Sequence, residues 1–367
     1  MIHMRRFISY SQLKRLVLEA SNPMASVWDA VSTSPSPSTD GDDEDHPGRE
    51  FPDTKRDIEK KFDIKYGMVF KYKGESPDVV IPDEINAIAR DAFSGRKDIK
   101  SVFIPHSVSH IDRYAFANCE SLSSIDIPTS VTNIGDHAFE NCTSLADLTI
   151  PSSVRTIGEH AFRNCTGIKT LVMIPSHGTT LGDGVFYGCS GIRSVTVPSS
   201  VECIPDHAFS KCFNLMLVTI KPGVKLIGMQ AFYSCGRLAS VEIPDTVSEI
   251  GNWAFHKCAS LYEVKIPSSM TKIGYGVFSY CDSLASLTIP NSVKTIGPSA
   301  FKCCTDLRRV VIPDSVTRIK EAAFDGCASL EDVEMPAELL GNTLENPDWA
   351  FFNTPWGSRM KRRSRPV

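Results

Sequence analysis

A phenylalanine returns along this chain at an almost constant interval. Nine steps between successive copies are 23 residues and one is 24, and a cysteine follows three positions later in ten of the eleven copies. A fixed period of twenty to fifty residues is typical of repeat proteins, in which each unit packs only against its neighbours. The sequence therefore predicts a stack of equivalent coils. The repeated residues are Phe93, Phe116, Phe139, Phe162, Phe186, Phe209, Phe232, Phe255, Phe278, Phe301 and Phe324.

A single unit cannot be stable alone. Each unit offers about seven apolar positions, and burying one contributes roughly 1.5–3 kcal/mol. Ordering the residues of one unit costs on the order of 1–2 kcal/mol apiece in backbone entropy alone. Because this cost exceeds the gain, stability must come from contacts and hydrogen bonds between stacked coils.

The unit at residues 127–151 predicts two short strands. Residues 145–150 end in alternating apolar side chains, and the following proline closes the strand because it has no N–H. Residues 131–134 form a second apolar run, ended by a glycine. Residues 136–142 lack β-branched side chains and start with an N-cap type, which predicts one or two helical turns. The extra residue of the 24-residue step falls in the apolar run 171–174 and predicts a β-bulge.

The consensus of these units resembles a known family. The pattern I-P-x-S-V-x-x-I-G-x-x-A-F-x-x-C-x-x-L-x-x-[VIL]-x-I-P is similar to the BspA-type, or treponemal-type, leucine-rich repeats over about residues 79–336. The resemblance implies a leucine-rich repeat solenoid that is β-rich with short helical turns, about eleven 23-residue coils stacked with parallel strands. It also implies a binding scaffold, since such repeats generally bind other molecules and the secreted members act as surface adhesins.

The repeat and its flanks predict five segments. Pro, Ser and acidic residues dominate the second part of the N-terminal segment, which therefore cannot bury enough apolar surface to fold. Apolar and polar residues alternate just before the first coil, which predicts a strand or hairpin that caps the open edge. The segments are 1–57 (disordered or targeting), 58–78 (N-terminal cap), 79–336 (solenoid), 337–358 (C-terminal cap) and 359–367 (basic tail).

The first 20 residues are amphipathic and basic, with Glu19 as their single acidic residue. Lys14 and Arg15 interrupt the apolar core that a secretory signal needs. Two interpretations stay open, an organelle transit peptide and a loosely attached helix. With no stretch of about 20 apolar residues for a membrane span, the sequence predicts an intracellular, cytoplasmic location, with an organelle or the nucleus as alternatives. The apolar residues of this segment include Phe7, Ile8, Leu13, Leu16 and Val17.

Ten of the twelve cysteines occupy one position of the repeat. Neighbouring coils lie about 4.8 Å apart, but stacked side chains point in parallel and not at each other. We therefore expect buried free thiols instead of disulfides. Cys203 and Cys303 fall outside this position and are predicted to be the more reactive thiols, or else ordinary surface cysteines.

No pattern in the sequence predicts catalysis, a cofactor or a metal site. The position two residues before each phenylalanine varies in type, which predicts an exposed side chain, and His137 and His160 there lack a third metal ligand. Asn141 and Asn164 stand in glycosylation sequons that arise from the repeat itself. The sequence predicts a non-catalytic protein-binding scaffold. A cell-surface adhesin and a β-solenoid enzyme are the alternatives.

The partner is expected to be an unidentified protein and the chain a monomer. The net charge of −4 predicts no nucleic-acid ligand except through the basic tail. The positions four, five and seven after each cysteine point away from the core, and apolar or basic residues there mark a candidate binding surface. The alternative is that the apolar pair in this surface is covered by a loop or isolated. The candidate residues are Arg193, Met216, Leu217, Tyr262, Lys265, Arg308 and Arg309.

Overall fold

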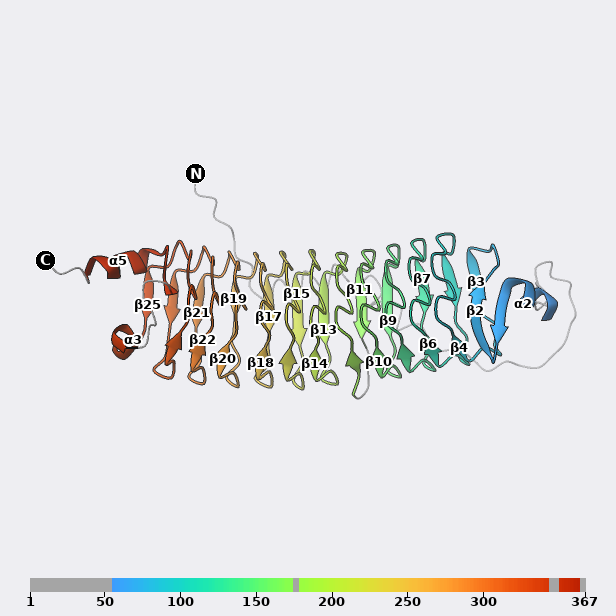
Figure 1. The fold of residues 1–367 in the computed structure, drawn as a ribbon, viewed down its shortest axis with the longest axis horizontal. Coiled ribbons are helices and arrows are strands. Elements are labelled where there is room, and N and C mark those ends of the chain that lie inside the picture. Colours follow the sequence, from blue (N-terminus) through green and yellow to red (C-terminus); the bar gives the residue numbers. More distant parts are fainter. Residues whose placement is uncertain (1–54, 174–177, 343–349, 364–367) are drawn as a thin grey trace, which may run out of the picture.

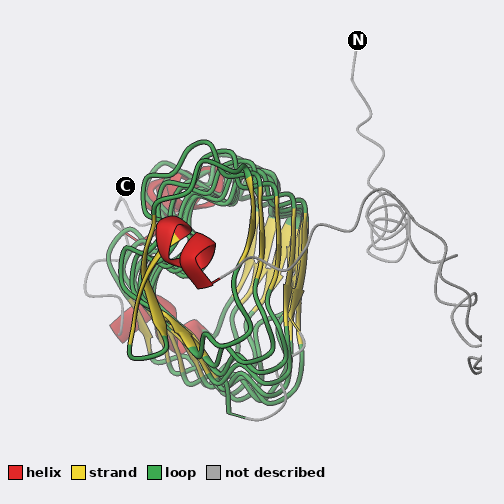
Figure 2. Ribbon diagram, turned by 90° about the vertical axis from the view of Figure 1, so that its right-hand side faces the viewer, coloured by secondary structure: helices red, strands yellow, loops and turns green. Residues whose placement is uncertain are grey.

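The chain winds into one elongated solenoid whose coils lie side by side from the N-terminal to the C-terminal end (Figure 1). This computed structural model describes residues 55–173, 178–342 and 350–363. The coils contribute strands to two faces, mostly three or four residues long on one and two residues long on the other, and the turns between them close the cross-section (Figure 2). The architecture is the predicted stack of about eleven coils with parallel strands.

The longer strands form one side of the solenoid, which we call the long-strand face. Residues 23 apart are direct partners in its parallel ladder, as Val218 and Val241 are. Its strands are β3 (Asp78–Val80), β5 (Ser101–Phe103), β7 (Ser124–Asp126), β9 (Asp147–Ile150), β11 (Thr170–Met173), β13 (Ser194–Val197), β15 (Leu217–Ile220), β17 (Ser240–Glu242), β19 (Glu263–Val264), β21 (Ser286–Thr288), β23 (Arg309–Val311) and β25 (Asp332–Glu334).

Two-residue strands form the short-strand face. Each of these strands ends before the glycine position of the repeat, so each pairs with its neighbours over two residues. Its strands are β4 (Ala87–Ile88), β6 (His110–Ile111), β8 (Asn133–Ile134), β10 (Thr156–Ile157), β12 (Thr180–Leu181), β14 (Cys203–Ile204), β16 (Leu226–Ile227), β18 (Glu249–Ile250), β20 (Lys272–Ile273), β22 (Thr295–Ile296) and β24 (Arg318–Ile319).

The segment between the two strands of a coil is built from successive tight turns, where the sequence predicts helical turns. In one coil, Glu140 N donates to His137 O at 3.1 Å and Cys142 N donates to Phe139 O at 3.2 Å. A continuous helix cannot form because His137 and Asn141 adopt left-handed backbone, with φ of 56° and 60°. Their amides instead bond to the next coil.

The predicted bulge in residues 171–174 is wrong. β11 pairs with β9 in regular register from Thr170 to Met173. Thr180 is then the partner of Thr156, 24 residues away. The extra residue therefore falls between Met173 and Thr180, outside both ladders, which keep their regular register.

A column of phenylalanine rings runs through the core. The rings from Phe93 to Phe324 are fully buried, and successive centroids are 4.8–5.6 Å apart with nearly parallel planes. Phe351 adds a further ring at the C-terminal end, 5.0 Å from Phe324. Val, Ile and Leu from both faces pack around this column into one continuous core. Offset aromatic stacking adds to the burial energy of each ring.

Both ends of the core are closed by elements outside the repeat. At the N-terminal end, α2 (Lys55–Lys61) leads into a hairpin of β1 (Phe62–Lys65) and β2 (Met68–Tyr72), and β2 pairs with β4. At the other end lie α3 (Ala337–Asn342) and α5 (Pro355–Arg363), and Trp356 contacts Phe351 at 4.7 Å. None of the helices in the described ranges combines the length and hydrophobicity needed to cross a bilayer.

Candidate functional site

The residues just before the long strands form a straight row across the long-strand face. Met216 N donates to Arg193 O at 2.8 Å, Ala239 N to Met216 O at 3.0 Å, and Tyr262 N to Ala239 O at 3.2 Å. Arg308 stands two coils beyond Tyr262 in the same row. The backbone ladder thus fixes the spacing of these side chains, and the structure brings together the residues that the sequence places on one surface.

The exposure of these side chains differs from one coil to the next. Arg193, Lys265, Arg308 and Arg309 are exposed, whereas Met216 and Tyr262 are half-buried. The prediction that Leu217 is an exposed apolar residue is wrong, since only 4% of it is accessible. Among the described residues, Leu217 is buried without belonging to the continuous core. Its neighbour Val218 belongs to that core, so alternation along β15 places Leu217 on the opposite side of the sheet.

Two of the four exposed cations in this surface are already paired. Arg309 forms ion pairs with Asp332, at 3.4 Å, and with Glu334. Lys265 lies 3.4 Å from Asp245. Within the described part of the chain, Arg193 and Arg308 form no ion pair. Arg193 and Arg308 can therefore bind an acidic partner group without giving up an existing ion pair.

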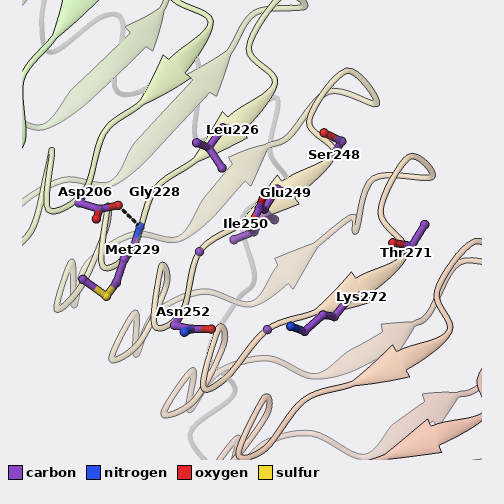
Figure 3. A pocket seen from close by; sticks show the side chains of 12 residues that line it. Asp206, Leu226, Gly228, Met229, Ser248, Glu249, Ile250, Asn252, Thr271 and Lys272 are labelled. Atoms are coloured by element: carbon purple, nitrogen blue, oxygen red, sulfur yellow. Dashed lines mark hydrogen bonds between the residues drawn. The ribbon is translucent and has the colours of Figure 1, made fainter.

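A groove of about 570 Å³ lies on the short-strand face, at the step between β18 and β20 where the ladder is interrupted. Figure 3 shows Asp206, Met229 and Asn252 along one side of it and Ser248 and Thr271 along the other. The remaining lining residues are Leu226, Gly228, Glu249, Ile250, Gly251, Lys272 and Gly274. This groove is not among the sites that the sequence predicts.

An Asp or Asn side chain after the glycine position tethers one coil to the next along this groove. Asp206 Oδ1 accepts from Met229 N at 2.6 Å, and Asn252 Oδ1 accepts from Tyr275 N at 3.0 Å. The Asp or Asn that recurs after the glycine position of the repeat is the sequence signal that could have located this groove. These hydrogen bonds already occupy Asp206 and Asn252, so the groove is a weaker candidate than the row on the other face.

The variable position before each phenylalanine is constrained by its backbone and is half-buried where exposure was predicted. The rings of Tyr114 and His137 stack there with centroids 4.7 Å apart, His160 lies tilted at 5.2 Å from His137, and all three residues adopt left-handed φ. His137 Nδ1 lies 2.7 Å from a carboxylate oxygen of Glu140. Within the described ranges, no three metal-ligating side chains gather.

The asparagines of the two sequons form a side-chain ladder. Asn141 Nδ2 donates to Asn118 Oδ1 at 2.8 Å, and Asn164 Nδ2 donates to Asn141 Oδ1 at 3.0 Å. All three adopt left-handed φ, which asparagine tolerates better than most residues. The asparagine of each sequon is thus accounted for by the left-handed turn position that it occupies. A glycan on its Nδ2 atom would break the side-chain ladder.

All twelve cysteines are free thiols. Each of the ten in the repeat position donates Sγ–H to the carbonyl of the phenylalanine one coil earlier, as Cys235 does to Phe209 O at 3.1 Å. Burial raises the pKa of the Cys235 thiol to about 12. Cys203 is exposed and Cys303 half-buried, and burial raises the pKa of both. The repeat thiols therefore have little thiolate and react slowly.

Comparison with known proteins gives a family for these coils. The family model for the BspA type leucine rich repeat region matches in six copies, over residues 66–193, 170–282 and 225–354. No curated protein sequence matches the chain.

Solved structures of bacterial repeat proteins are similar. A leucine-rich repeat protein from Bacteroides ovatus is 25% identical with a TM-score of 0.56, over 80% of this chain and 90% of that one. One from Eubacterium ventriosum is 22% identical with a TM-score of 0.51, over 78% and 88%. A leucine rich cell surface protein from Faecalibacterium prausnitzii is 23% identical with a TM-score of 0.39, over 78% and 96%.

Proposed function

Because this chain belongs to the family of BspA-type leucine-rich repeat proteins, we propose that it is a non-catalytic scaffold that binds another protein through its long-strand face. The observation that carries the proposal is the row Arg193, Met216, Tyr262 and Arg308, which the ladder holds in fixed register. Met, Tyr and Arg are the residue types enriched at the centres of protein interfaces. A preordered surface also loses little conformational entropy on binding.

The chemistry of this surface indicates the kind of partner. Its two unpaired guanidinium groups stand at the ends of the row, with the half-buried Met216 and Tyr262 between them. A partner segment with carboxylates flanking an apolar centre would match this order of groups. Arginine pairs with carboxylates in bidentate fashion, which adds geometric specificity. The expected partner is therefore an acidic and apolar protein segment, and the intracellular location stays a prediction.

Reversing the charge at one end of the row and removing its apolar centre should weaken binding. For Met216→Ser combined with Arg308→Glu we expect Kd for a partner captured with the full-length chain to rise about thirtyfold, about 2 kcal/mol. The melting temperature should stay unchanged because neither side chain lies in the core. Titration calorimetry of parent and variant measures both the affinity and its change.

The matched control is Arg155→Glu, an equally exposed charge reversal on the short-strand face. It should leave Kd unchanged. If the control weakened binding as much as the double variant, or if the double variant bound like the parent, the partner would bind elsewhere and the proposed surface would be wrong.

A further inference from the structure

The outer surface of the long-strand face is covered at one place. Ser124, Asp147, Glu263, Ser286, Arg309 and Asp332 are the exposed residues five positions after the repeat cysteine. In β15 and β17 the same position holds Leu217 and Ser240, which are only 4% and 5% accessible. Thr219, on the same outer side of β15, is 8% accessible. These residues belong to two neighbouring coils, and β15 and β17 lie in the middle part of the solenoid (Figure 1).

Neighbouring side chains of the sheet do not explain this burial. The partners of Leu217 in the ladder are Ser194 and Ser240, which are too small to enclose a leucine. Ser240 Oγ is buried and has no hydrogen-bond partner among the described residues. A buried hydroxyl without a partner is costly, so the group that covers it should also supply a hydrogen bond.

We propose that residues 1–20 of the same chain dock on the outer surface of β15 and β17, with apolar side chains over Leu217. The composition of this segment suits such a site. Its apolar side chains could cover Leu217, and its other residues are mainly basic, with Glu19 as the single acidic residue. Glu242 and Glu263 are exposed beside the covered residues and form no ion pair within the described ranges. A basic segment therefore matches the charge at the border of the patch.

The length of the connecting chain fits this site. The strands β3 and β15 are six ladder steps apart, about 29 Å at about 4.8 Å per step, and Lys55, where the described chain begins, lies in α2 beyond β3 (Figure 1). A fully extended chain spans at most about 3.3–3.6 Å per residue, so a connection as long as residues 21–54 can reach roughly 110 Å, well beyond this distance. The segment would thus meet the patch at a high effective concentration. The other stretches outside the described ranges are 174–177, four residues that join β11 to β12 two coils before β15, and 343–349 and 364–367, which follow β25 at the C-terminal end.

Docking at this site would regulate the proposed function. The patch lies between Arg193 and Tyr262 of the candidate row, so the segment and a partner would compete. This consequence rests on the proposed function, but the docking itself does not. A test in the isolated protein therefore separates the two.

The rate of thiol modification at Ser240→Cys tests the docking directly. The full-length chain carries Cys203→Ser and Cys303→Ser, so that only the slow, buried repeat thiols remain as background. The matched control is Ser286→Cys, which has the same position in an exposed coil. We expect the thiol at position 240 to react about tenfold more slowly than the thiol at position 286. This ratio corresponds to a docked state that is about ten times more populated than the open state.

Adding Leu13→Asp and Leu16→Asp should remove the protection and leave the melting temperature unchanged. The rate at position 240 should then approach the rate at position 286. Three results would overturn the proposal: equal rates in the parent background, protection that survives the two aspartates, or protection that grows with protein concentration. The last result would assign the cover to a second copy of the chain.

Discussion

Replacing Phe209 by Ala should destabilise the protein by about 3–5 kcal/mol, the usual cost of removing a fully buried phenylalanine. The ring is inaccessible to solvent and lies between Phe186, at 5.3 Å, and Phe232, at 5.5 Å. The cavity would interrupt the aromatic column in the middle of the solenoid. Urea unfolding of parent and variant measures the loss.

Two further variants serve as controls for Phe209→Ala. Phe213→Ala lies in the same coil but removes a ring that is 53% accessible, and it should change stability by less than about 0.5 kcal/mol. Phe351→Ala removes the last ring of the column, and its effect should be smaller than that of Phe209→Ala because a terminal coil can fray. Equal stability of Phe209→Ala and the parent would contradict the stacked core.

Replacing Arg96 by Ala should open the N-terminal end of the solenoid. Arg96 occupies the cysteine position in the first coil, and its guanidinium donates to Tyr72 O at 3.1 Å and Gly74 O at 2.6 Å. It also pairs with Asp98 at 2.6 Å and lies 4.7 Å from the Tyr72 ring. Hydrogen bonds to a charged group contribute about 1.5–3 kcal/mol.

The loss of the Arg96 hydrogen bonds should appear as faster native-state hydrogen exchange of the amides in β2 and β4. The amides of the central coils should keep their exchange rates. Arg90→Ala is the matched control, since among the described residues the Arg90 side chain pairs with its exposed neighbour Asp91 and with the Tyr114 ring, and with no group of the hairpin. Unchanged exchange in β2 after removal of Arg96 would show that the hairpin holds the end without it.

The repeat made the stack of coils predictable, because every apolar position recurs and has only one way to be buried. Val131, Ile134 and Leu148 each face the core of their own coil and the equivalent residue of the next. The tight turns were harder to predict. Asp136 and the residues after it resemble a helix start, but left-handed φ at His137 and Asn141 is a backbone property that residue types only hint at.

The surface was predictable in direction but not in exposure. Alternation along a strand predicts Leu217 on the outer side, and the residue lies outside the core cluster. Whether an outward residue is covered depends on segments far away in the sequence, which periodicity does not reveal. The groove beside Asn252 was missed for a related reason, because it depends on an interrupted ladder between β18 and β20.

Hydroxyl-radical footprinting of the full-length protein, with and without its captured partner, most directly tests binding through the long-strand face. Met216 lies in the candidate row and Met229 in the groove of the other face, so the two methionines report on the two surfaces. The proposed function predicts that the partner protects Met216 and Tyr262 from oxidation and leaves Met229 unchanged. Protection of Met229 with unchanged oxidation of Met216 would contradict it.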